Sequence, residues 1–195
     1  MPEPRLLGKI VRLQIQRTPL KLGEKPNRWY DPAGLMTVNE LTLTPQGAVA
    51  RQPDGSPVPD IHHLAHPETR SSGLANTLSF GFTPHYAAMR GRYGAHMFDG
   101  CAGENILVAT DRTVLLDEVR NGISIRCAGV AQPISLGGVR VARPCREFSA
   151  YAQEGPGAKA LKEALQFLDN GMRGYWCRLD GETDAVITVG DEVWA

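Results

Sequence analysis

The chain consists of short runs of alternating apolar and polar residues, repeatedly interrupted by glycine and proline, of which it holds 21 and 14. In "VRLQIQ", residues 11–16, Val11, Leu13 and Ile15 share one side, which is the period-two pattern of a half-buried strand. Further runs of this kind are "ELTLT", "NILVAT", "ISIRCAGV", "GVRVA", "YWCRL" and "AVITVG". Short strands separated by turn residues favour a barrel or a sandwich. The sequence therefore predicts a mainly β fold, with residues 1–195 forming a single domain.

Helical patterns are scarce. "PGAKALKEALQFLDNG", residues 156–171, places its leucines on one face and ends in an Asn-Gly stop signal, so we expect a helix there. A second, short helix is expected in "TPHYAAMRGRYG", with Thr83 as the N-cap and Pro84 at the first helical position. Gly91 and Gly94 should keep this helix short.

A histidine-rich stretch, "DIHHLAHPETR", lies in a loop with four prolines among 23 residues, so no long element is expected there. His62 and His66 have the i, i+4 spacing of a helical metal-binding pair. However, Pro67 disfavours helical angles at His66, and the glutamate of the H-E-x-x-H pattern is absent. Three interpretations of His62, His63 and His66 stay open: zinc ligands, polar groups that line a pocket together with Arg70, or a solvated loop.

Two glycines precede an acid and an amide in "GCAGENI", residues 100–106. Glycine lets the backbone approach a ligand closely, and exposed N–H groups there can bind an anion. Glu104 adds an acceptor, and Asn105 adds both a donor and an acceptor. The segment after Gly103 is either one wall of a binding cleft or an ordinary turn that leads into a strand.

Cys145, in "VRVARPCREF", follows a proline and is flanked by Arg143 and Arg146. Positive charge favours the thiolate form of cysteine, although Glu147 opposes it here. We expect the strand to continue through this point, so that residues 143, 145 and 147 share one face. Cys145 is therefore the candidate reactive thiol of the chain.

The other three cysteines, Cys101, Cys127 and Cys177, stand in apolar, glycine-rich or aromatic contexts and are expected in the core. The spacing of the four excludes a C-x-x-C pair or an iron–sulfur motif. Arg173 stands between two glycines in "GMRGY" and either contacts a phosphate or is a solvated loop residue.

Acidic and basic residues balance at 21 each, so no overall field favours nucleic acid or an anionic membrane. The first residues, "MPEPRLLGKIVRLQIQ", lack the apolar stretch of a signal peptide, and no window holds the roughly 20 apolar residues of a membrane span. We expect a cytoplasmic protein with free thiols and with neither nucleic acid nor membrane as a partner.

Taken in order, "GCAGENI", "RPCREF", "GMRGYWCRL" and "VGDEV" resemble the motifs of the molybdenum cofactor sulfurase C-terminal (MOSC) domain family. The resemblance is strongest from about Gly100 to Val193. The stretch "DIHHLAHPETR" looks like a divergent form of the family's histidine-glycine segment without its double glycine. The resemblance implies a distorted, closed β-barrel with a few peripheral helices.

The resemblance also implies a site. Cys145 would bind the molybdenum of a pterin-type cofactor (molybdopterin), and the cofactor would lie against a small set of cleft residues. That set comprises Gly103, Glu104, Asn105, Arg70, Arg143 and Arg173.

The activity that the resemblance implies is the reduction of N-hydroxylated or N-oxide-type small molecules. Because the chain has no motif for its own flavin or iron–sulfur group, a separate electron-donor protein is expected. Two other functions stay open: a persulfide carrier for metal–sulfur assembly, and a cofactor-binding module without catalysis.

Overall fold

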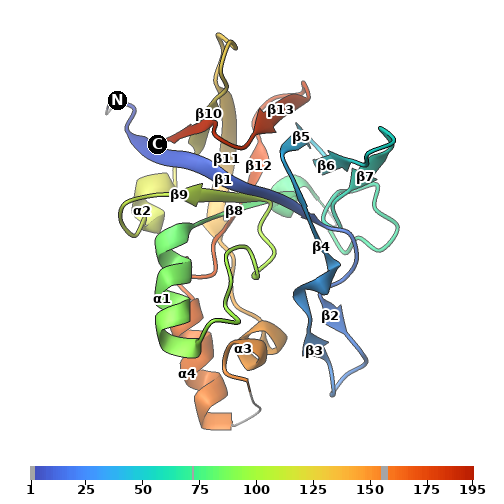
Figure 1. The fold of residues 1–195 in the computed structure, drawn as a ribbon, viewed down its shortest axis with the longest axis vertical. Helices are drawn as coiled ribbons and strands as arrows, with labels where there is room; N and C mark the ends of the chain where they lie inside the picture. The colour runs from blue at the N-terminus through green and yellow to red at the C-terminus, as the bar shows by residue number, and fades with distance from the viewer. Residues whose placement is uncertain (1–2, 72, 155–157) are drawn as a thin grey trace.

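A computed structural model describes residues 3–71, 73–154 and 158–195. Its central feature is a closed, mixed barrel of seven strands in the order β14-β10-β11-β12-β8-β9-β1, closed by pairing of β1 with β14 (Figure 1). Only β8 and β9 run parallel among these barrel pairs. The strands are β1 (Leu6–Gln16), β8 (Leu78–Phe82), β9 (Ile106–Ala109), β10 (Ile123–Arg126), β11 (Ile134–Val141), β12 (Tyr175–Leu179) and β14 (Glu192–Trp194). The mainly β, closed-barrel prediction is confirmed.

Smaller sheets flank the barrel. Strand β4 (Leu35–Val38) pairs with the end of β1. A four-stranded sheet has the order β13-β5-β6-β7, formed by β13 (Ala185–Thr188), β5 (Glu40–Thr44), β6 (Gly47–Arg51) and β7 (Pro57–Pro59). Strands β2 (Lys21–Leu22) and β3 (Trp29–Tyr30) form a separate hairpin.

Strand β1 departs from simple alternation. Val11 is 45% exposed, whereas Ile10, Leu13 and Ile15 are buried. The register against β9 shifts between Ile10 and Arg12, as at a β-bulge. Because one extra residue reverses the alternation, the expected placement of Val11 on the core side is wrong, while Leu13 and Ile15 lie in the core as expected.

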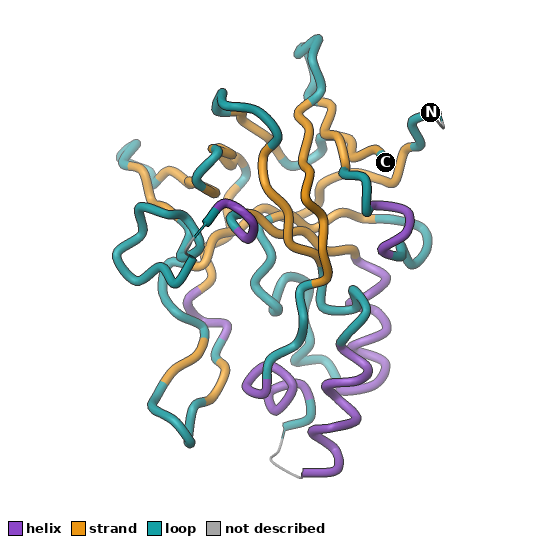
Figure 2. Tube along the Cα trace, turned by 180° about the vertical axis from the view of Figure 1, so that it is seen from behind, coloured by secondary structure: helices purple, strands orange, loops and turns teal. Residues whose placement is uncertain are grey.

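The helices are α1 (Thr83–Tyr93), α2 (Leu116–Val119), α3 (Arg146–Ala152) and α4 (Ala158–Leu168), with 3-10 turns at Pro32–Gly34 and Leu74–Asn76. Figures 1 and 2 show α1, α3 and α4 together at the end of the barrel away from the two chain termini. The β2–β3 hairpin extends from the same end (Figure 1). The helices and the hairpin therefore frame one end of the barrel.

The expected helix before the Asn-Gly stop is confirmed by α4, although Pro156 and Gly157 lie outside the described residues. The expected short helix is confirmed by α1, with differences at both ends. Phe82 is the N-cap instead of Thr83 because β8 leads directly into the helix, and α1 passes through Gly91 before Gly94 caps it. Helix α3 was not expected, because the stretch containing Cys145 was interpreted as a strand.

Two groups of buried side chains hold this arrangement together. One fills the barrel interior, and the other lies between the barrel, the helices and the hairpin. In the second group Tyr30 of the hairpin packs edge-on against Phe148 of α3, with ring centroids 5.0 Å apart. Aromatic contacts of this kind stabilise the position of the hairpin relative to α3.

Within the described ranges, no helix combines the length and apolarity that crossing a bilayer requires.

Candidate functional site

A cavity of about 160 Å³ lies where the β2–β3 hairpin, β12 and the histidine-rich loop meet. Its walls include Gln16, Tyr30 and Trp176. A smaller cavity of about 10 Å³ adjoins it, sharing Gln16, Trp176 and Arg173, and is also lined by Gly103 and Glu104. We refer to the two cavities together as the cleft.

Positive charge dominates the larger cavity. Lys21, Arg28, Arg70 and Arg173 line it, with Glu68 as the acidic residue among the lining side chains. The buried Nε atoms of Arg28 and Arg173 have no hydrogen-bond partner among the described residues. Because guanidinium groups bind oxyanions through such N–H groups, the cleft has the chemistry of an anion site.

Arg173 is a half-buried part of the cleft, so the interpretation as a solvated loop residue is wrong. Its Nη1 donates to the carbonyl of Arg143 at 3.1 Å, and its Nη2 donates to the carbonyl of Ala102 at 3.3 Å. The guanidinium also lies 5.2 Å from the centre of the Phe148 ring. These contacts hold the positive charge at the junction of the two cavities.

The loop of residues 100–103 forms the inner wall. Gln14 and Gln16 of β1 donate to the carbonyls of Gly100 and Gly103, each at 2.7 Å. Gly103 has a φ of +87°, and a Cβ there would lie 2.6 Å from Gln16 Nε2. Glycine is therefore required at this position both for its backbone angle and for the close approach of Gln16.

Glu104 is 4% exposed and lines the smaller cavity. Its Oε2 accepts a hydrogen bond from the Tyr86 hydroxyl at 2.7 Å, whereas its Oε1 has no partner within the described part of the chain. Burial raises the pKa of Glu104 to about 7, although the Tyr86 hydrogen bond and the Arg173 charge act in the opposite direction. The carboxyl group therefore exchanges a proton near neutral pH.

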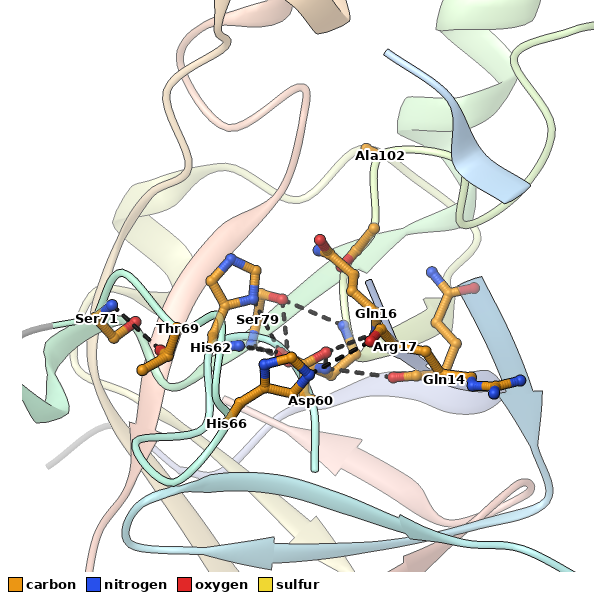
Figure 3. A network of polar contacts seen from close by, with 12 residues as sticks. Gln14, Gln16, Arg17, Asp60, His62, His66, Thr69, Ser71, Ser79 and Ala102 are labelled. Atoms are coloured by element: carbon orange, nitrogen blue, oxygen red, sulfur yellow. Dashed lines mark hydrogen bonds and ion pairs between the residues drawn. The ribbon is translucent and has the colours of Figure 1, made fainter. Parts of the chain in front are cut away.

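Asn105 is 1% exposed and belongs to a buried polar network behind the cleft. Figure 3 shows Gln16, Asp60, His62 and Ser79 of this network. Its Oδ1 accepts from the Ser79 backbone N–H at 3.0 Å, and its Nδ2 donates to Asp60 at 3.1 Å. Asp60 also accepts from the backbone N–H of Gln16 at 2.7 Å and from the backbone N–H and Nδ1–H of His62 at 2.8 and 2.9 Å. Asn105 thus ties β8, β9 and the histidine-rich loop together.

The three histidines have different environments. His62 lines the cleft and contacts Trp176, with ring centroids 4.9 Å apart. His63 and His66 are 7% and 8% exposed, and their Nδ1 atoms accept from backbone N–H groups two residues later. The solvated-loop interpretation is therefore wrong for His63 and His66. In residues 3–71, 73–154 and 158–195, no group of three or more His, Cys, Asp or Glu side chains could hold a metal ion.

Cys145 is the N-cap of α3 and is partly buried. Its Sγ accepts a hydrogen bond from the backbone N–H of Phe148 at 3.4 Å. The expectation that residues 143, 145 and 147 share a strand face is wrong, because the chain turns into a helix at Cys145. Arg146 donates to the carbonyl of Pro26 at 3.0 Å, so its guanidinium reaches the hairpin.

Cys145 lies beside the cleft. It is not among the described residues that line the two cavities, and neither are Arg143 and Asn105. Its connection to the cleft passes through Phe148, which contacts both Tyr30 and Arg173.

The other three thiols have raised pKa values. Cys101 and Cys177 are fully buried, as expected from the sequence, and burial raises the pKa of both above the usual range. Cys127 is partly buried, and burial together with Asp191 raises its pKa to about 12. At neutral pH these three sulfurs are held as thiols.

Several cleft residues were not identified from the sequence. Lys21 and Arg28 stand on either side of the hairpin turn, and neither had a motif around it. Gln16 lines the cleft, and Gln14 holds the inner wall through the Gly100 carbonyl. The alternation in residues 11–16 predicts an outward-facing side chain at both positions, but both are buried. Two glutamines on the same strand face, near an otherwise apolar core, are the signal that could have indicated a polar interior site.

No protein-family profile matches the sequence, and no curated protein sequence matches it either. Solved structures do match the fold. The YuaD protein from Bacillus subtilis is 14% identical with a TM-score of 0.61, covering 100% of this chain and 97% of that one. YiiM from Geobacillus stearothermophilus is 14% identical with a TM-score of 0.50, covering 98% of this chain and 75% of that one.

A further solved structure, of a hypothetical protein, is 14% identical with a TM-score of 0.56 and covers 97% of this chain and 68% of that one. At such low identity the likeness concerns the fold alone. Similarity to YuaD and YiiM, together with the seven-stranded barrel, fits a MOSC-like fold.

Proposed function

We propose that the chain is an oxidoreductase that binds a molybdenum cofactor in the cleft and reduces N-hydroxylated or N-oxide-type small molecules. The observation that carries the proposal is the cation-lined cleft beside the partly exposed thiol of Cys145. Its electrons would come from a separate protein, because the described residues offer no cluster of metal ligands for a redox centre of the chain's own.

The residues fit the phosphate end of such a cofactor. The Nε–H groups of Arg28 and Arg173 are buried without partners among the residues that the structure describes, and a phosphate oxygen would satisfy them. Lys21 and Arg70 add further positive charge at the larger cavity. Gly103 adds no side chain to the inner wall, and the Gln16 amide occupies the place where its Cβ would lie.

The residues also fit the metal end. A cysteine thiolate is a soft ligand, suited to a sulfur-bound metal centre. Burial raises the pKa of the neighbouring Glu147, but a backbone hydrogen bond and the charges of Lys21 and Arg28 lower it below its usual value, so positive charge reaches this corner. When bound, the cofactor would supply the two-electron chemistry, and the chain would supply orientation and charge.

One observation favours a second candidate function. Cys145 is partly exposed and lies between two arginines, which also suits a persulfide carrier for metal–sulfur assembly. The third alternative, a binding module without catalysis, needs only the cleft.

Metal analysis of protein from a cofactor-competent host tests the proposal. We expect stoichiometric molybdenum in the wild type, loss of it in Cys145→Ala, and retention in Cys127→Ala, which removes another partly buried thiol. A wild type without molybdenum would refute the proposed function. In that case, a mass increase of one sulfur on Cys145 would support the carrier.

A further inference from the structure

The Glu104 carboxyl group lies at the junction between the protein interior and the cleft. Its Oε2 is held by the Tyr86 hydroxyl of α1, which itself accepts from the backbone N–H of Ala102 at 3.1 Å. Glu104 lines the smaller cavity, and its buried Oε1 has no partner in the described chain. One carboxyl oxygen is therefore fixed, and the other is available to a proton.

Charged and titratable groups face Glu104 from several elements. Arg173 approaches from the loop before β12, and Arg12 approaches from β1. Tyr86 of α1, Tyr30 of β3 and Cys101 are also close, but burial raises the pKa of all three, so they are neutral near neutral pH. The charge state of Glu104 therefore depends mainly on its burial and on the two arginines.

Arg173 is shared between the carboxyl group and the larger cavity. It lines both cavities, and its Nε is buried without a partner in the described residues. An oxyanion bound at Arg173 would stand close to the Glu104 carboxylate in a site with little water. Two negative charges in such a site repel each other strongly, and protonation of the carboxylate removes that repulsion.

We propose that binding of a sulfate- or phosphate-type oxyanion in the cleft is coupled to the uptake of a proton from solvent by Glu104, at Oε1. The inference deepens the proposed function, since it rests on the cleft as an anion site, but it requires no molybdenum. The proton enters with the anion and leaves with it, while Tyr86 keeps its hydrogen bond to Oε2.

The acidity of Glu104 supports this coupling. With a pKa of about 7 in the free protein, the carboxyl group is close to half protonated in neutral solution. If anion binding raises the pKa of Glu104 by about one further unit, the anion binds about tenfold more tightly at low pH than at high pH. Near pH 7.5 the protein then takes up about half a proton for each anion bound.

Titration calorimetry with sulfate tests the inference. Sulfate stays a dianion between about pH 6 and pH 8.5, so any proton that moves belongs to the protein. Repeating the titration in Tris and in HEPES, whose ionisation enthalpies differ, gives the number of protons taken up. We expect about half a proton per sulfate in the wild type near pH 7.5, with affinity falling about sevenfold from pH 6 to pH 8.5.

Three variants assign the proton. Glu104→Gln keeps the shape of the neutral carboxyl group and should bind sulfate with the same affinity at every pH and with no proton uptake. Glu68→Gln removes an exposed carboxylate from the same cleft and should keep the wild-type pH dependence. His62→Gln should also keep it, which separates the imidazole in the cleft wall from Glu104.

If the wild type binds sulfate without taking up a proton, the inference is overturned. This result needs no variant, so misfolding of a variant cannot cause it. Coupling that disappears in His62→Gln but persists in Glu104→Gln would overturn it as well, as would the absence of sulfate binding. Failure of the proposed function is recognised separately, because a protein without molybdenum can still bind sulfate with proton uptake.

Discussion

Replacing Asp60 by asparagine should destabilise the fold, because the Asp60 carboxylate is fully buried and accepts four hydrogen bonds. Oδ2 faces the donors of Gln16 and Asn105, and Oδ1 faces the two donors of His62. In Asp60→Asn one carboxylate oxygen becomes an NH₂ group, which is itself a donor and faces two other donors. The His62 ring can change tautomer and accept a hydrogen bond from this NH₂ group, but a backbone N–H or the Asn105 amide is still left without an acceptor.

An unpaired buried donor costs about 1–3 kcal/mol, and loss of the charge weakens the remaining bonds, so we expect about 3 kcal/mol in total. With a urea m-value of about 2 kcal/mol/M, the denaturation midpoint should fall by about 1.5 M at unchanged m. Asp54→Asn, a matched change at an exposed turn, should move the midpoint very little. A midpoint in Asp60→Asn equal to that of the Asp54 variant would refute the role given to the buried network.

Three further outcomes are expected. Cys145 should be the first thiol alkylated near pH 7 in the cofactor-free protein, as mass spectrometry of iodoacetamide-treated samples would show; earlier labelling of Cys101 would contradict the burial argument. Gly103→Ala should lower the thermal stability more than Gly129→Ala does. Both positions have a positive φ, which costs an alanine about 1–2 kcal/mol, but only a Cβ at Gly103 meets other atoms. Equal losses of stability would show that the approach of Gln16 imposes no constraint. Between pH 4.5, the usual pKa of a glutamate, and about 7, folded Glu104 retains a proton that the unfolded chain releases, so stability should fall by up to about 3 kcal/mol as the pH rises. Urea titrations of Glu104→Gln should lack this decrease, and an identical pH profile in the variant would exclude Glu104 as its cause.

Period-two alternation was sufficient to predict a mainly β fold, because strands with one buried face must alternate, but it left a barrel and a sandwich open. The closed barrel was implied by the family resemblance. It could not locate the bulge in β1, since a single extra residue leaves no composition signal and yet places Val11 on the outside. The helix α3 was missed for a related reason. Its seven residues follow a proline and a cysteine, and cysteine is not a typical N-cap residue.

The site was predictable in part. Arg70, Arg173, Gly103 and Glu104 were selected from local motifs, and all four line the cleft. The sequence could not indicate Lys21 and Arg28, because their proximity to Arg173 depends on the packing of the hairpin against α3. Long-range packing of this kind leaves no trace in local spacing.

The position of the metal tests the central claim most directly. Crystals of cofactor-loaded protein, measured at the molybdenum absorption edge, should give one anomalous peak at bonding distance from the sulfur of Cys145, next to the cleft that Arg173 lines. A peak beside another cysteine, or at a surface site remote from the cleft, would contradict the account.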